Sequence, residues 1–151
     1  MKFEVQNLTE LKKVAEEILS VFPSHKLFLL CGEMGAGKTT LTKEFCKILQ
    51  CEGYGSSPTF SIVNEYHSPL HKKIYHFDCY RLTDPEELEY IGIREYLKPK
   101  SLQLIEWPEL GKGALEKADI SIKLSGNGET RKVKITFQTD LGKSIKECAV
   151  G

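Results

Sequence analysis

The sequence lacks any long hydrophobic run. Its longest uninterrupted apolar stretch covers residues 27–31, whereas a membrane-spanning helix needs about 20 apolar residues. The amino-terminal residues 1–7 also lack the continuous apolar segment of a secretory signal. We therefore expect a cytoplasmic protein that makes no use of a membrane.

An excess of charge of either sign is missing as well. Lys and Arg number 21, Asp and Glu number 21, and the formal net charge is zero. Nucleic-acid binding draws on several Lys and Arg contacts to phosphates, so a chain without a basic field has little power to capture a polyanion alone. We expect any nucleic acid to be held mainly by a partner.

Paired cysteine motifs are absent too. The five cysteines form no C-x-x-C pair, and an odd number cannot pair completely within one chain. We expect reduced thiols that mostly fill the core.

What is present is typical of one globular domain. The chain has 151 residues, of which 40% are hydrophobic and 28% charged, and it shows no repeat or low-complexity tract. We place a single domain at residues 1–138. Residues 139–151 carry no clear pattern and are expected to form a short, frayed tail.

Hydrophobic periodicity predicts alternating strands and helices. Asn7, with Glu10 three residues later, is a typical start for the first helix. Asp84 and Pro85 are a typical start for a later one, running to about residue 97. Predicted helices cover 8–22, 38–49 and 85–97, and predicted strands cover 3–6, 27–31, 60–66, 73–80, 102–105, 119–124 and 132–137. This order favours an α/β layered sheet with mixed parallel and antiparallel pairing and helices packed on it.

The most informative segment is 32–39, which fits the phosphate-loop (P-loop) pattern G-x-x-x-x-G-K-[ST] without mismatch. It follows a predicted buried strand and opens a predicted helix, so its backbone N–H groups and the helix amino terminus can face a phosphate. Lys38 is placed to reach the terminal phosphates, and the Thr39 hydroxyl to ligate Mg²⁺. The fold expected is therefore P-loop NTPase-like.

Two carboxylates are candidates to hold or orient that magnesium ion. Asp78 and Glu106 each stand at the carboxyl end of an apolar strand, where ligands collect in open α/β sheets. Spacing alone leaves the division of roles between them open.

The motif content also separates classes of nucleotide-binding protein. The chain contains neither N-K-x-D nor D-x-x-G, the strings of small GTPases, so ATP is expected rather than GTP. A small-molecule kinase is the rival enzyme, although it usually brings several arginines to the transferred phosphoryl group, and only Arg81, Arg94 and Arg131 are available. A nucleotide-gated binding module is the third class.

Four blocks together resemble the bacterial tRNA threonylcarbamoyladenosine biosynthesis ATPases, the TsaE (YjeE-type) family. They are Gly32–Thr40, Ser57–Phe60, the pair His76–Leu82 and Asp84–Leu88, and Ile105–Pro108. Their order and spacing match over roughly residues 3–137. The P-loop alone is generic, whereas the other blocks are specific to this family.

The resemblance implies an Mg²⁺-dependent ATPase that is slow alone and is stimulated by partners. Those partners would be a two-protein, TsaB/TsaD-type complex that transfers the threonylcarbamoyl group to tRNA, beside the anticodon. ATP hydrolysis would support turnover of that complex, and tRNA would be reached only through it.

By matching positions, the resemblance also implies roles for individual residues. Lys38, Asp78 and Thr59 would serve catalysis, with Thr59 in a nucleotide-sensing loop, and Thr39 and Glu106 would ligate Mg²⁺. The nucleotide would be bound by Thr9, Glu33, Met34, Gly35, Ala36, Gly37, Lys38, Thr39, Thr40 and Trp107. His76 is expected to have a structural role only.

Overall fold

The computed structural model describes residues 2–20, 27–33, 35–52, 62–69, 72–97, 101–111, 117–126 and 130–140. Within them the strands are β1 (Lys2–Val5), β2 (Leu27–Cys31), β3 (Val63–Ser68), β4 (Lys72–Asp78), β5 (Leu102–Glu106), β6 (Lys117–Ser125) and β7 (Arg131–Asp140). The α-helices are α1 (Leu8–Leu19), α2 (Lys38–Ile48), α3 (Glu87–Tyr90) and α4 (Ile93–Leu97), and η1 (Cys79–Arg81) and η2 (Pro108–Gly111) are 3₁₀ turns.

The strands form one seven-stranded sheet in the order β1-β7-β6-β2-β5-β4-β3. The central four, β6, β2, β5 and β4, run parallel, while β3, β7 and β1 add antiparallel pairs at the two sides. The expected mixed α/β sheet is confirmed. Because the P-loop strand β2 lies between β6 and β5, side chains from both halves of the sheet can reach the loop that follows it.

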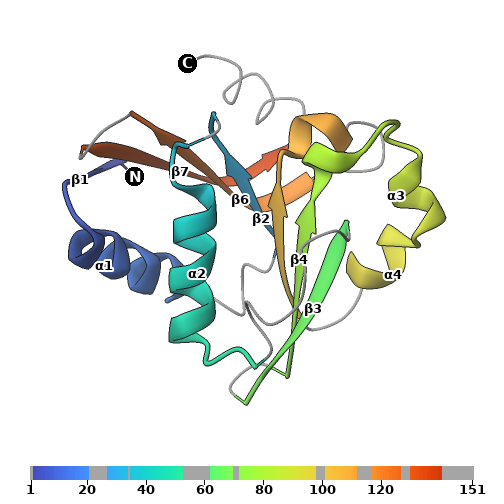
Figure 1. Ribbon diagram of the computed structural model, residues 1–151, viewed down its shortest axis with the longest axis horizontal. Helices are drawn as coiled ribbons and strands as arrows, with labels where there is room; N and C mark the ends of the chain where they lie inside the picture. The colour runs from blue at the N-terminus through green and yellow to red at the C-terminus, as the bar shows by residue number, and fades with distance from the viewer. Residues whose placement is uncertain are drawn as a thin grey trace.

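Side-chain alternation along β2 divides the core between the two faces of the sheet. Phe28 and Leu30 pack into one cluster with the apolar stripes of α1 and α2. Leu29 packs into another with Leu88 of α3 and Ile93 of α4. Figure 1 shows the corresponding layers, with α1 and α2 on one side of the sheet and α3 and α4 on the other.

The first helix begins as its sequence predicts. The Asn7 Oδ1 accepts a hydrogen bond from the Glu10 backbone N–H at 2.9 Å, and the Glu10 carboxylate accepts one from the Gln6 N–H at 2.8 Å. Both contacts satisfy donors at the start of the chain segment that becomes helical. This cap fixes the turn between β1 and α1, which borders the candidate site.

The predicted helix at 85–97 is two helices instead. Asp84 does accept a hydrogen bond from the Glu86 N–H at 2.8 Å, but α3 ends at Tyr90. Gly92 follows with a backbone φ of 78°, a left-handed conformation that interrupts the helix before α4. Glycine in this position is the physical cause of the break.

The other boundaries differ by a few residues. Strand β3 extends to Ser68, which was expected in a turn but pairs with Lys72, and residues 60 and 61 lie outside the described part. Strand β4 ends at Asp78 because the chain turns there into η1. Strand β7 runs to Asp140, two residues past the expected domain end, and residues 141–151 lie outside the described part.

The prediction of reduced cysteines is wrong for Cys31, which is disulfide-bonded. An odd number of cysteines leaves one unpaired but does not prevent a pair, so composition could not decide this point. Cys46, Cys51 and Cys79 are not disulfide-bonded, in agreement with the prediction. A hydrogen bond between neighbouring thiols raises the pKa of Cys46 and lowers that of Cys51.

None of the helices in the described residues has the length and apolar composition that a membrane span requires.

Candidate functional site: a phosphate loop facing two carboxylates

The loop between β2 and α2 depends on glycine at two points. Gly32 has a φ of 147°, and a Cβ there would lie 2.6 Å from the Leu124 carbonyl oxygen. Gly37, the N-cap of α2, has a φ of 111°. Both positions need a residue without a side chain, so the loop can stay close to the neighbouring strand β6 and still turn directly into the helix.

Lys38 is the first residue of α2, and its side chain is folded over the loop. The Nζ donates a hydrogen bond to the Gly32 carbonyl oxygen at 2.5 Å and lies 3.3 Å from the centre of the Trp107 ring. Although it is a lysine, the residue is only 5% exposed. The ring face and the carbonyl oxygen both stabilise a buried ammonium group.

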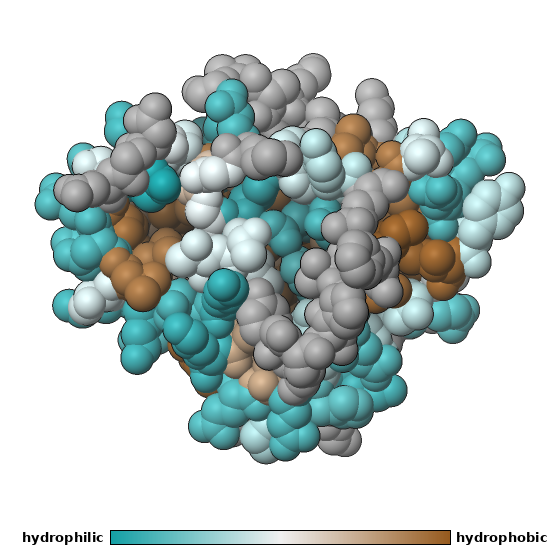
Figure 2. All heavy atoms as spheres, viewed as in Figure 1, coloured by the Kyte–Doolittle hydropathy of each residue, from teal (hydrophilic) through white to brown (hydrophobic). Residues whose placement is uncertain are grey.

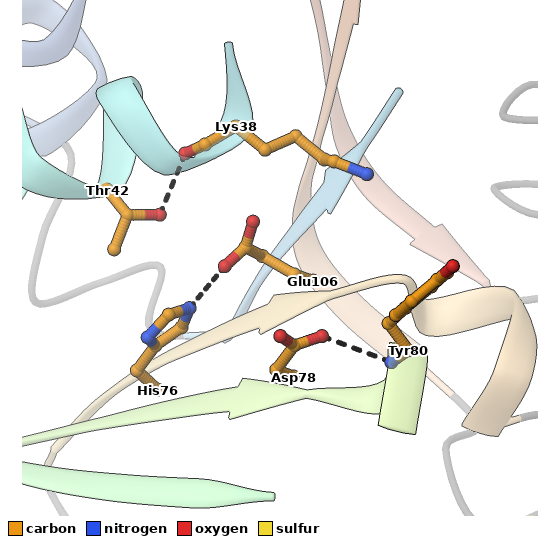
Figure 3. A network of polar contacts seen from close by, with 6 residues as sticks. All are labelled: Lys38, Thr42, His76, Asp78, Tyr80 and Glu106. Carbon is orange, nitrogen blue, oxygen red and sulfur yellow. Dashed lines mark hydrogen bonds and ion pairs between the residues drawn. The ribbon is translucent and has the colours of Figure 1, made fainter. Parts of the chain in front are cut away.

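Asp78 and Glu106 lie at the carboxyl ends of the parallel strands β4 and β5, directly opposite each other in register. Glu106 is also in register with Leu30 of β2, next to the start of the P-loop. Figure 3 shows both carboxylates gathered with Lys38 in the space above these strand ends. The pair predicted from strand-end spacing is therefore brought together.

Each carboxylate has a different partner. The Glu106 Oε2 lies 2.5 Å from the His76 Nε2, and the two side chains are 8% and 12% exposed. Asp78 accepts a hydrogen bond from the Tyr80 N–H at 3.1 Å, as Figure 3 also shows. Within the described residues, Glu106 is thus held by an imidazole, and Asp78 by the turn that follows it.

An aromatic pair closes this end of the site. Trp107, directly after Glu106, has a φ of 55°, which is uncommon for a residue of this size. Its ring lies 5.0 Å from that of Tyr80, centre to centre. This backbone conformation allows the strand to end while the indole turns over Lys38.

These elements line one cavity of about 830 Å³. Asp78, Glu106, Tyr80 and Trp107 form what we call its carboxylate end. The opposite end, which we call the apolar end, is formed by Val5, Leu8, Leu11, Leu124 and Arg131. Figure 2 shows apolar side chains over α1 and over α3 and α4, with hydrophilic residues between them.

The residues of the cavity fit a nucleotide with a magnesium ion. Among the described residues, no group of three or more His, Cys, Asp or Glu side chains is placed to hold a metal by itself. Magnesium usually binds through one or two carboxylates together with substrate phosphates and water, so Glu106, Asp78 and the Thr39 hydroxyl are a suitable donor set. The glycine loop and Lys38 can hold the phosphates, and the apolar end can hold a base.

The candidate residues from the sequence are divided among three places. Gly35, Ala36, Gly37, Lys38, Thr39 and Thr40 line the cavity, and so do Asp78, Glu106 and Trp107. Glu33 and Thr9 are exposed and do not line it, although Thr9 is adjacent to the lining residue Leu8. Met34 and Thr59 lie outside the described residues.

His76 was expected to have a structural role, and its contact with Glu106, which follows from the pairing of β4 with β5, agrees with that expectation. Sequence reasoning missed two other residues of the site. Tyr80 lies two residues after Asp78 in the family block, but the sequence does not reveal its contact with Trp107. That contact depends on the 3₁₀ turn η1, which carries Tyr80 to the indole ring. Arg131 carried no motif at all.

The parallel sheet core with a glycine loop between β2 and α2 and paired acids at the neighbouring strand ends defines an α/β protein of the P-loop type. Comparison with known proteins places it more narrowly. The model of the family described as threonylcarbamoyl adenosine biosynthesis protein TsaE matches residues 5–133. The chain therefore belongs to the TsaE family, a family of tRNA threonylcarbamoyladenosine biosynthesis.

Individual relatives agree with this membership. The tRNA threonylcarbamoyladenosine biosynthesis protein TsaE of Haemophilus influenzae is 44% identical over 135 residues, covering 89% of this chain and 85% of the relative. That of Bacillus subtilis is 35% identical over 139 residues, covering 91% and 84%. The crystal structure of Bacillus subtilis YdiB superposes with a TM-score of 0.69 at 27% identity, covering 98% of this chain and 90% of that one.

Proposed function

We propose that this protein is an Mg²⁺-dependent ATPase that supports threonylcarbamoyladenosine formation in tRNA. The observation that carries the proposal is the meeting of Lys38, Asp78 and Glu106 at the edge of the sheet where the P-loop begins. One lysine and two acids around a glycine loop suit a phosphate–magnesium group and few other ligands. Family membership supports the tRNA modification pathway.

Each residue has a separate task in this proposal. Lys38 leaves the Gly32 carbonyl and the Trp107 ring to contact the β- and γ-phosphates as a point charge. Glu106, held by His76, and the Thr39 hydroxyl hold the metal, which when bound neutralises charge developing on the phosphates. Asp78, which accepts a hydrogen bond from the Tyr80 N–H, orients the attacking water. Thr59 contributes to a loop that senses the γ-phosphate.

ATP is preferred over GTP in this proposal because the chain lacks the guanine-reading string. Hydrolysis by the chain alone is slow, because Arg131 is the single arginine lining the cavity among the residues that the structure describes. An arginine supplied in trans raises phosphoryl-transfer rates by roughly 10³–10⁵-fold in other systems. A two-protein transferase complex of the TsaB/TsaD type fills that need here, and it holds the tRNA.

Two measurements test the proposal on the full chain. Calorimetric titration with MgATP is expected to give binding that Lys38→Ala weakens on the order of 100-fold. Steady-state phosphate release is expected to rise when the purified partner pair is added. Thr59→Ala is expected to leave MgATP affinity nearly intact and to remove the stimulation.

The outcomes separate the rival functions. Equal phosphate release with and without partners would overturn the accessory-ATPase role. A phosphorylated small molecule in place of free phosphate would establish a kinase. Tight MgATP binding without turnover in either condition would leave a nucleotide-gated binding module.

A further inference from the structure

Arg131 is a charged residue of the cavity lining to which neither a motif nor the family resemblance points. It is the first residue of β7, and in the sheet it pairs with Val5, the last residue of β1. Its side chain crosses to the P-loop, where the Nη2 donates a hydrogen bond to the Gly35 carbonyl oxygen at 3.3 Å. The guanidinium group is therefore part of the phosphate loop's surroundings, although 96 residues separate it from Gly35.

The second terminal nitrogen of the guanidinium group, Nη1, has no hydrogen-bond partner in the part of the chain that the structure describes. This nitrogen is buried. The Nε is 3.9 Å from where a Cβ on Gly37 would lie, so the whole planar group lies along the loop. A buried cationic donor without an acceptor costs free energy unless a ligand provides one. Facing a phosphate loop, that ligand is an anion.

The sheet order indicates which part of a nucleotide would supply the anion that Arg131 contacts. β7 and β6 lie on one side of β2, whereas β5 and β4, with Glu106 and Asp78, lie on the other. In the proposed function the metal and the γ-phosphate belong to the carboxylate end, so Arg131, on the other side of β2, faces the half of the nucleotide away from the γ-phosphate. Beside it are Val5 and Leu8, which suit the base rather than a phosphate. Between base and β-phosphate lies the α-phosphate.

We propose that Arg131 is a nucleotide-binding residue whose Nη1 donates to an α-phosphate oxygen. This inference rests on the proposed function, because it takes the ligand to be an adenine nucleotide. In this role Arg131 contributes equally to the binding of ATP and of ADP, and it does not stabilise the transferred γ-phosphoryl group.

Calorimetry with ADP in the absence of magnesium tests the inference without any catalysis. Wild-type protein is expected to bind, and Arg131→Met to bind roughly 10- to 150-fold more weakly, the loss expected for a hydrogen bond to a charged group. Arg131→Lys, which keeps the charge, is expected to lie between the two. Lys132→Met removes an exposed cation from the next position in β7 and is expected to change nothing.

Stability and kinetics separate this role from others. The ligand-free melting temperature of Arg131→Met is expected to stay within about 4 °C of wild type, while the rise in melting temperature caused by ADP shrinks. With ATP, KM is expected to rise and kcat to stay unchanged. A large fall in ligand-free melting temperature shared by Arg131→Lys would show a loop brace instead, and would overturn the inference.

Three further results would also overturn it. Unchanged ADP affinity in Arg131→Met would remove the contact. Equal losses in the Met and Lys variants would indicate stacking on the base rather than donation to phosphate. A fall in kcat with unchanged KM would move Arg131 to the γ-phosphate. If wild-type protein itself bound no ADP, the proposed function would fail together with this inference.

Discussion

The two ends of the cavity are built in different ways. At the carboxylate end, Lys38, Asp78 and Glu106 come from segments with recognisable motifs, and each lies at the end of a buried strand or the start of a helix. At the apolar end, Leu8, Leu124 and Arg131 come from three elements without any motif. The charged end depends on a few residue types in fixed places, and the apolar end depends only on surfaces that the fold brings together.

This difference explains what the sequence could predict. β2, α2, β4 and β5 were found because their apolar patterns are local, and Lys38, Asp78 and Glu106 followed from their places at the ends of those elements. Arg131 could not be found, because the pairing of β7 with β1 and β6 brings it to the P-loop. The prediction of one helix at 85–97 was wrong for a local reason. Gly92 takes a left-handed conformation, which the hydrophobic pattern does not reveal.

If the carboxylate end performs the chemistry, the largest effect is expected from Asp78→Asn. The change removes the charge that orients and activates water but keeps the shape and the contact to the Tyr80 N–H. We expect kcat for partner-stimulated phosphate release to fall by about 10²–10⁴-fold, with MgATP affinity nearly unchanged. Glu86→Gln, an exposed acid on the α3 turn, is the control. If Asp78→Asn lowered the affinity for MgATP and left kcat unchanged, Asp78 would be assigned as the metal ligand instead.

The next effect is expected from Lys38→Ala, measured as affinity. Removing the ammonium group takes away two charge-assisted contacts to phosphates, and we expect ATP to bind on the order of 100-fold more weakly. Lys43→Ala, an exposed lysine on the same helix, is the control and is expected to bind ATP normally. Normal ATP affinity in the Lys38 variant would mean that the glycine loop is only a connection.

Glu106→Gln is expected to affect only the magnesium-dependent part of binding. Calorimetry with ATP is done at several magnesium concentrations, and the variant is expected to need roughly 10- to 100-fold more metal. Binding of ADP without magnesium is expected to stay as in wild type, because the apolar end is intact. A loss that persists without metal would show that Glu106 positions Lys38 and not magnesium.

His76→Gln is expected to give a smaller change of the same kind. The 2.5 Å contact from the His76 Nε2 fixes the Glu106 carboxylate, and loss of such an outer partner costs roughly 10-fold in metal affinity. Because His76 acts through Glu106, the double variant with Glu106→Gln is expected to need no more magnesium than Glu106→Gln alone. Additive losses would show that His76 acts separately.

The smallest effect is expected at the apolar end, from Leu8→Ala. Leu8 is 54% exposed in the structure and lines the cavity, so a bound base would cover part of its side chain. Burial of apolar surface contributes about 25 cal/mol per Å², and the truncation is expected to weaken ADP and ATP binding only about three- to ten-fold. Magnesium dependence and kcat are expected to stay unchanged, because no phosphate or metal ligand moves.

The neighbouring residue Thr9 provides the sharpest control for Leu8→Ala. Thr9 does not line the cavity in the structure, yet the family resemblance places it at the base. Comparing Thr9→Ala with Leu8→Ala in the same ADP titration decides between the two residues, since they lie side by side on the first turn of α1. If Leu8→Ala has the larger effect, the base lies against the apolar wall beside Arg131. If Thr9→Ala does, the base lies over the helix surface, and the apolar end is not the base site.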